Sequence, residues 1–175
     1  MTLKSTKSAI TSMDVLRVAP GYPPEDAFSK GAIAVIECIE EIPCNPCEAA
    51  CRFGAIYVGD HLTALPQLLA EKCNGCGRCI AACPGLAIFL VDKTYSESEA
   101  LLSLPYEFLP VPDVGATVAA LDRQGQLICK ATVIRVDNRP RNNYCRVVSI
   151  TVPKQYADVV RGIRCKAEKE KADEK

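Results

Sequence analysis

The segment from Cys73 to Pro84 places the tightest constraint on how this chain folds. It reads Cys73-Asn-Gly-Cys76-Gly-Arg-Cys79-Ile-Ala-Ala-Cys83-Pro84, so four thiols fall within one short loop and the turn that follows. Gly75 and Gly77 allow the backbone to turn sharply and bring amide N–H groups close to whatever the thiols bind. Pro84 suits the boundary of a short helix. This spacing predicts a loop wrapped around an inorganic centre.

The chain has 11 cysteines, and three chemistries could use them. Disulfides need an oxidising compartment, yet the count is odd and we expect no secretion signal at the N-terminus. A zinc site could pair Cys44 and Cys47 with Cys73 and Cys76. That pairing leaves the last two cysteines of the Cys73–Pro84 segment without a metal to bind, whereas the iron–sulfur spacing C-x₂-C-x₂-C-x₃-C-P uses all four. Iron–sulfur is the favoured prediction and zinc the alternative.

A less regular cysteine block lies N-terminal to this segment and reveals an internal repeat. Cys44, Cys47 and Cys51 lie 32 positions before the last three cysteines of the other block. The residues after each block also match, with Ala55-Ile-Tyr-Val in one copy and Ala87-Ile-Phe-Leu in the other. Two copies of one cluster-binding unit are the simplest interpretation.

On these motifs, residues 31–92 resemble the bacterial-type ferredoxin domain with two [4Fe–4S] clusters. The resemblance implies an α+β core of ββ hairpins and short helices, related by a pseudo-twofold repeat. It also implies crossed ligation, in which the fourth cysteine of each block binds the other block's cluster. Cluster 1 would take Cys38, Cys44, Cys47 and Cys83, and cluster 2 would take Cys73, Cys76, Cys79 and Cys51.

Two departures from the family pattern affect the first block. Five residues, not two, separate Cys38 from Cys44, so Cys38 is either a ligand on a bulged loop or a buried thiol beside a three-iron cluster. Arg52 replaces the proline that usually follows the fourth cysteine. We interpret Arg52 as a substitution at a helix boundary. The alternative is that its charge raises the reduction potential of the adjacent cluster.

The remaining sequence divides into three parts around this core. Residues 1–30 are expected to form an extended N-terminal arm, and 93–112 a linker that includes a helical turn before Leu104. Residues 113–175 are expected to form a small antiparallel β subdomain with a C-terminal helix. In that helix four apolar residues would share one face: Tyr156, Val159, Val160 and Ile163. The three isolated cysteines are interpreted as buried packing residues: Cys129, Cys145 and Cys165.

Charge and composition argue against several kinds of partner and activity. Lys+Arg and Asp+Glu are balanced at 21 each, so no overall field favours nucleic acid or an acidic membrane surface. The apolar runs are too short to span a bilayer, and a cytoplasmic protein is expected. The sequence has no Gly-rich dinucleotide loop and no nucleophile paired with a base. We therefore expect a non-catalytic electron-transfer subunit, not an enzyme with its own active site.

The motif Glu41-Ile-Pro-Cys44-Asn-Pro-Cys47-Glu48, with the C-terminal region, is similar to a narrower group. It resembles the ferredoxin-type subunits of FAD-dependent amine or amino-acid dehydrogenases, of the proline or sarcosine type. That resemblance implies an anaerobic hetero-oligomer with an FAD-containing dehydrogenase subunit, and a [2Fe–2S] subunit as a further candidate partner. Two other functions stay open at this point: an iron–sulfur redox or oxygen sensor, and a structural interaction module.

Overall fold

The computed structural model describes residues 12–142 and 145–165. Its helical elements are α1 (Met13–Val18), η1 (Glu25–Lys30), α2 (Pro46–Ala50), η2 (Ala70–Lys72), α3 (Arg78–Ala82), η3 (Pro140–Asn142) and η4 (Lys154–Tyr156). Its strands are β1 (Ile33–Ile36), β2 (Ile56–Tyr57), β3 (Gln67–Leu68), β4 (Ile88–Asp92), β5 (Glu99–Tyr106), β6 (Thr117–Leu121), β7 (Leu127–Asp137), β8 (Arg146–Pro153) and β9 (Gly162–Arg164). Within the described residues, no helix is long and apolar enough to cross a membrane.

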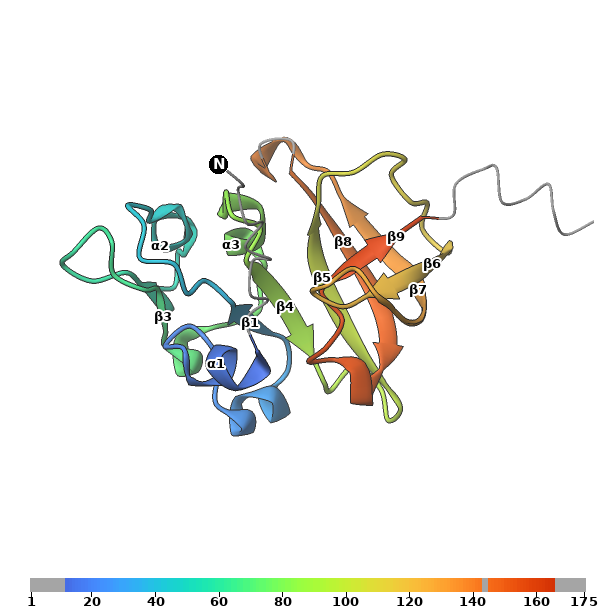
Figure 1. The fold of residues 1–175 in the computed structure, drawn as a ribbon, viewed down its shortest axis with the longest axis horizontal. Helices are drawn as coiled ribbons and strands as arrows, with labels where there is room; N and C mark the ends of the chain where they lie inside the picture. Colours follow the sequence, from blue (N-terminus) through green and yellow to red (C-terminus); the bar gives the residue numbers. More distant parts are fainter. Residues whose placement is uncertain (1–11, 143–144, 166–175) are drawn as a thin grey trace, which may run out of the picture.

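One antiparallel sheet runs through both halves of the molecule (Figure 1). Its strand order is β1-β4-β5-β8-β7-β6-β9, and a separate pair, β2-β3, lies beside α2 in the cysteine-rich half. The larger part of the sheet curls, so that the edge strand β9 returns toward β5. Cys165, just after β9, has its Sγ 3.3 Å from the Tyr106 hydroxyl of β5.

The ladder between β1 and β4 separates two hydrophobic cores. Alternation along a strand sends successive side chains to opposite faces. Ala34 pairs with Leu90 and Ile36 with Ile88, and these four residues pack in the smaller core with the cysteines. The intervening residues belong to the larger core, which fills the curled sheet: Ile33, Val35, Phe89 and Val91. Both faces of this ladder are therefore buried, which explains its nearly unbroken apolar sequence.

The predicted N-terminal arm is not extended where the structure describes it. Residues 13–18 and 25–30 form helical turns, and Leu16 and Phe28 are buried. The chain between them bridges the two sheets, because Ile36 N–H donates to the Gly21 carbonyl and Leu68 N–H to the Pro20 carbonyl. These backbone bonds and buried side chains dock the segment onto the domain. Residues 1–11 lie outside the described residues.

Two further predictions for the C-terminal half are wrong. The expected linker at 93–112 contains β5, a central strand paired with both β4 and β8. The expected C-terminal helix is replaced by the turn η4 and the short strand β9, whose Ile163 pairs with Ala120 of β6. In both places pairing across the sheet outweighs the local helical pattern of Glu, Ala and Leu residues. Residues 166–175 lie outside the described residues.

Candidate metal centres

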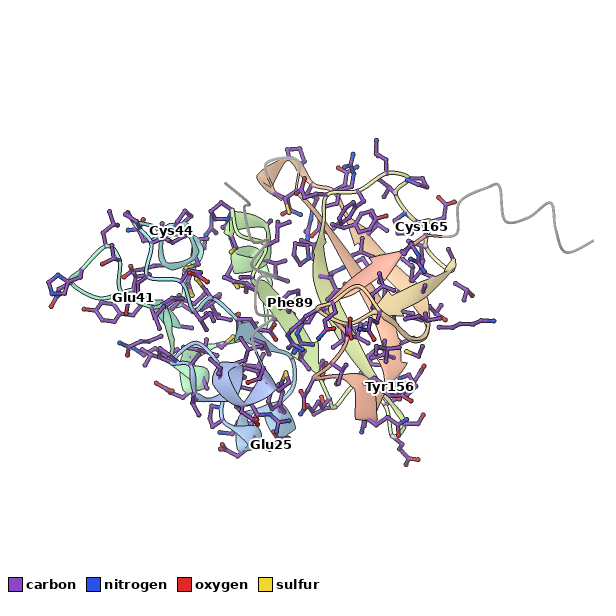
Figure 2. All side chains as sticks on the ribbon, viewed as in Figure 1. Glu25, Glu41, Cys44, Phe89, Tyr156 and Cys165 are labelled. Carbon is purple, nitrogen blue, oxygen red and sulfur yellow. The ribbon has the colours of Figure 1, made fainter. Side chains whose placement is uncertain are left out.

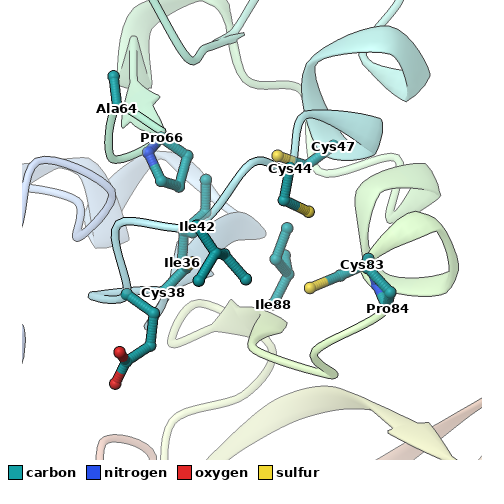
Figure 3. Close-up of a pocket in the computed structure, with 11 residues that line it drawn as sticks. Ile36, Cys38, Ile42, Cys44, Cys47, Ala64, Pro66, Cys83, Pro84 and Ile88 are labelled. Atoms are coloured by element: carbon teal, nitrogen blue, oxygen red, sulfur yellow. The ribbon is translucent and has the colours of Figure 1, made fainter. Parts of the chain in front are cut away.

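The first cavity in the cysteine-rich half is lined by four thiols that come from both repeats. Cys38, Cys44, Cys47 and Cys83 surround it together with Ile36 and Ile88 of the central ladder. Figure 3 shows Cys44 and Cys83 approaching this space from different segments of the chain. The structure thus places Cys38 with the other three cysteines, despite the longer gap that follows it in the sequence.

The second cavity repeats this arrangement with the remaining block cysteines. It is lined by Cys51, Cys73, Cys76 and Cys79, and its apolar wall includes Ala34 and Leu90, which pair two positions farther along the same ladder and on the same face. In the described parts of the chain, no three Cys, His, Asp or Glu side chains converge closely enough to hold a single metal ion. The thiols of each set are instead distributed around the wall of a cavity.

Two short helices bring cysteines from one repeat to the other repeat's cavity. Cys47 lies in α2 and Cys79 in α3, and each lines the cavity of its own repeat. Both helices end at the next cysteine of the block, which leaves the helix in an extended conformation. As a result, Cys51 reaches the second cavity and Cys83 the first.

The same N–H···S hydrogen bond occurs in both repeats. Ala55 N–H donates to Cys51 Sγ at 3.2 Å, and Ala87 N–H donates to Cys83 Sγ at 3.4 Å. The two bonds are 32 positions apart, which is the offset of the sequence repeat. Hydrogen bonds to a ligating sulfur stabilise negative charge there and are a main determinant of reduction potential.

Burial affects the protonation of the thiols that line the cavities. It raises the pKa of Cys47 to about 11 and that of Cys79 to about 12, and it also raises the pKa of Cys38. Neighbouring cysteines add to each shift, because several thiolates close together repel one another. Metal binding to these sites must therefore release protons, since the thiolate is the form that ligates.

The loop of the second repeat depends on the small size of Gly75. Its φ of +68° is a left-handed conformation, and a Cβ there would lie 2.5 Å from the Ala32 carbonyl oxygen. The glycine thus lets the cluster loop pass directly against the residue that precedes β1. An alanine at this position would meet both backbone strain and a contact with main-chain atoms that cannot easily move.

We therefore expect Gly75→Ala to lower the free energy of unfolding by about 2 kcal/mol or more. Gly125→Ala is the matched control, because its φ is +76° but a Cβ there would meet nothing within 4 Å. The control should cost about 1 kcal/mol, from backbone strain alone. Denaturant unfolding of both variants under anaerobic conditions measures the difference, and equal costs would show that contact with Ala32 is unimportant.

A buried ion-pair network adjoins the first cavity, and sequence reasoning did not find it. Glu37 immediately precedes Cys38, and its side chain is only 6% exposed. Its carboxylate accepts hydrogen bonds from Arg123 Nε and Arg161 Nε, each at 2.7 Å, and also from Arg123 Nη2. Its backbone N–H donates to the carbonyl of Ala87, the residue whose own N–H reaches Cys83. Glu37 is thus connected to two cysteines of the first cavity.

Arg161 is the most buried member of this network. Its side chain is 3% exposed, and its Nη1 donates to the carbonyls of Ala157 and Val160 at 2.8 and 2.6 Å. Burial lowers the pKa of Arg161, and the Glu37 carboxylate opposes that shift. The network joins the cysteine-rich half to the curled sheet, because the two arginines lie beyond β6 and just before β9. The available sequence signal was a Glu that directly follows the apolar run 32–36 and precedes Cys38, but nothing local identifies its partners.

The remaining cysteines lie outside both cavities. Cys129 is half-buried in β7 against the larger core, Cys145 is buried before β8, and Cys165 contacts Tyr106 and the Pro110 carbonyl. All 11 cysteines are free thiols in the structure. Arg52 is exposed and follows Cys51 directly, and no ion pair is found for it within the described residues.

Comparison with known proteins identifies part of this region. Residues 66–89 match the family described as 4Fe-4S binding domain. A segment of the chain is 44% identical over 47 residues to one subunit of the Na(+)-translocating ferredoxin:NAD(+) oxidoreductase complex of Acetobacterium woodii, covering 27% of this chain and 14% of that protein. Another match, at 42% over 59 residues, is to one subunit of the ion-translocating oxidoreductase complex of Methanosarcina acetivorans, covering 34% of this chain and 20% of the relative.

Ferredoxin-type protein NapF of Escherichia coli K12 is 39% identical over 51 residues, covering 28% of this chain and 31% of NapF. The matched segments thus span less than a third of each of these relatives. No solved structure matches the chain. Together the matches show a 4Fe-4S ferredoxin domain that binds a [4Fe–4S] cluster, and they support an iron–sulfur electron-transfer role.

Proposed function

We propose that this chain holds two [4Fe–4S] clusters and relays single electrons as a non-catalytic subunit of a larger oxidoreductase complex. The observation that carries the proposal is the sorting of eight cysteines into two cavities, four to each. In this assignment Cys38, Cys44, Cys47 and Cys83 ligate cluster 1. Cys73, Cys76, Cys79 and Cys51 ligate cluster 2.

The residues around each cavity fit such a group. Four thiols supply the all-cysteine ligation typical of [4Fe–4S] clusters. Buried side chains such as Ile36, Ile88 and Ile56 exclude water from the cavity walls. One amide N–H in each repeat already points at a ligating sulfur. Burial raises the pKa of Cys38, Cys47 and Cys79, so a cation that balances the thiolate charge would favour ligation by these three residues.

Each group of residues around the two cavities has a role in the proposed electron transfer. When bound, a [4Fe–4S] cluster takes up and releases one electron at a time. The cysteines hold the two sites against alternate rungs of the β1/β4 ladder, Ile36–Ile88 and Ala34–Leu90, so both sites lie on one face of the same sheet. The amide of Ala55 or Ala87 stabilises added negative charge on a ligating sulfur at each site. The isoleucines keep water away, which limits reorganisation when the charge changes.

We further propose that the complex contains an FAD-dependent dehydrogenase subunit of the amine or amino-acid type. Two one-electron sites in one chain suit a flavin partner that gives up electrons in pairs. The motif from Glu41 to Glu48 supports this placement by resemblance. Two of the matched relatives are named as subunits of oxidoreductase complexes, which supports assembly with other chains but not a flavin dehydrogenase in particular.

The test is the iron and acid-labile sulfide content of anaerobically purified protein, with EPR spectra before and after reduction. We expect about eight of each per chain, and magnetically interacting signals from two neighbouring clusters after reduction. About seven irons, with a three-iron signal in the oxidised state, would show that Cys38 is not a ligand. About four irons would leave a single cluster, and stoichiometric zinc with little iron would overturn the electron-transfer proposal.

A further inference from the structure

A separate cleft lies on the other side of the central ladder, between the two edges of the curled sheet. The cleft has a volume of about 470 Å³ and is bounded by Phe89 of β4, residues 105–110, the β6–β7 turn and residues 161–165. Figure 2 shows that Phe89 lies where the cysteine-rich half meets the curled sheet, while Cys165 marks the far end of β9. Ligand-binding clefts usually have volumes of roughly 300–1,000 Å³.

The cleft is open to solvent, but it does not continue as a groove past the end of β9. Cys165 Sγ lies 3.3 Å from the Tyr106 hydroxyl, and both groups contact the Pro110 carbonyl, at 3.4 and 2.9 Å. These contacts close the gap between β9 and β5 at one end. A compact ligand therefore fits the space better than an extended peptide that would need to continue past this closure.

Aromatic rings form the walls of the cleft. Tyr106 and Phe108 are arranged edge to face, with ring centroids 5.8 Å apart, and Phe108 remains 69% exposed. On the inner side the Arg161 guanidinium lies over the Phe89 ring, 5.2 Å from its centroid. Flat aromatic and guanidinium surfaces favour a planar, ring-bearing ligand.

Three arginines line the same cleft and give it a positive charge. Arg123 and Arg161 share a single carboxylate, that of Glu37, and Arg164 is exposed without an ion pair among the described residues. The one acidic residue in the lining, Asp122, uses its Oδ1 to accept hydrogen bonds from the backbone of the turn. The buried Nη2 of Arg161 has no hydrogen-bond partner in the described structure, although its Nε and Nη1 are both engaged. The cleft thus offers guanidinium donors that are suited to an anion.

A strained leucine marks the rim of the cleft nearest cluster 1. Leu86 has φ +52°, whereas its counterpart in the first repeat is Gly54, with φ +60°. Leucine pays a steric penalty in this conformation that glycine avoids. Its side chain lines the cleft, and its N–H donates to the carbonyl of Cys83 at 3.2 Å. Strain retained at such a position is typical of functional sites.

We propose that this cleft binds a planar, ring-bearing anion of about the size of flavin mononucleotide, with the ring against the aromatic walls and the anionic group on the arginines. The proposal of a binding site depends only on the cleft and not on the two clusters. Its redox meaning rests on the proposed function: Leu86 lines the cleft and its N–H donates to the carbonyl of Cys83, so cluster 1, which Cys83 would ligate, would be the one that exchanges electrons with the ligand.

The test is calorimetric titration of the cluster-loaded full chain with FMN, under anaerobic conditions. Riboflavin is the matched ligand, because it has the same ring without the phosphate. We expect one saturable FMN site, with riboflavin binding about tenfold or more weakly. Arg164→Gln should weaken FMN about tenfold and leave riboflavin unchanged, whereas Phe108→Ser should weaken both ligands.

Two variants outside the cleft serve as controls. Arg135→Gln removes an exposed arginine from β7, and Leu62→Ser removes an exposed apolar side chain from the cysteine-rich half. Both should bind FMN as the unaltered protein does. Absence of saturable FMN binding, equal affinity for riboflavin, or insensitivity to the two cleft variants would each overturn the proposal. Iron and sulfide assayed on the same samples keep this result separate from the two-cluster proposal, since a loaded protein that fails to bind FMN rejects only the cleft.

Discussion

Replacing Cys76 with serine is expected to remove about half of the iron, lowering it from about eight to about four atoms per chain. Cys76 is the exposed thiol of the second cavity, and its loss leaves that cavity with three thiols and none on its solvent-facing side. All four cysteines of the first cavity remain, so the signal of cluster 1 should persist. Iron, sulfide and EPR measurements on anaerobically purified Cys76→Ser protein test this expectation.

Pairs of substitutions distinguish crossed from uncrossed ligation. In the crossed arrangement Cys51 shares the second cavity with Cys76, whereas Cys83 belongs to the first cavity. Cys51→Ser/Cys76→Ser should therefore lose no more iron than Cys76→Ser alone, and Cys76→Ser/Cys83→Ser should lose nearly all of it. The opposite pattern would contradict the crossed assignment.

Cys129→Ser is the control for general damage, because this thiol lies in β7 away from both cavities. The variant should retain about eight irons. Iron loss in Cys129→Ser comparable to that in Cys76→Ser would mean either that Cys129 contributes to a cluster or that the sheet must be intact for clusters to assemble. The first of these results would contradict its assignment as a packing residue.

The second large effect is expected from Glu37→Gln. The substitution keeps the size of the side chain but removes the negative charge that two arginines share, and Arg161 is almost completely buried. Breaking a buried ion pair on one side typically costs about 3–5 kcal/mol, because the remaining charge is left without compensation. We therefore expect the free energy of unfolding to fall by about 3 kcal/mol or more, measured by anaerobic denaturant unfolding.

Glu25→Gln provides a matched acid-to-amide control. Glu25 pairs with Lys93 at 3.1 Å, but its side chain is 77% exposed, so the variant should change stability by less than about 1 kcal/mol. A redox titration adds an independent readout, because Glu37 is close to two cysteines of the first cavity. It directly precedes Cys38, and its N–H donates to the carbonyl of Ala87, whose own N–H donates to Cys83 Sγ. Removing its negative charge should raise the potential of cluster 1 and leave that of cluster 2 nearly unchanged. A stability loss no larger than that of the control would show that the network does not hold the two halves together.

Errors in the predicted secondary structure share a physical cause. Residues 99–106 are rich in Glu, Ala and Leu, which favour helix, yet they form a strand between β4 and β8. Residues 156–163 carry apolar side chains at helical spacing, yet the segment turns and then pairs with β6. In each case a partner distant in the sequence supplies the hydrogen bonds, and local propensity is too weak to oppose it.

The cysteine spacing and its 32-residue repeat were sufficient by themselves to predict a cluster-binding unit and, by family resemblance, which cysteines would share a site. These signals are local, because each loop supplies three of its thiols within a few residues and the fourth from the end of a short helix. The Glu37 network and the aromatic, arginine-lined cleft are different in kind. Arg123 and Arg161 lie 86 and 124 positions from Glu37, and only the curling of one continuous sheet brings them together. No sequence pattern records that contact, because it depends on where the edge strand β9 returns and not on any residue near Glu37.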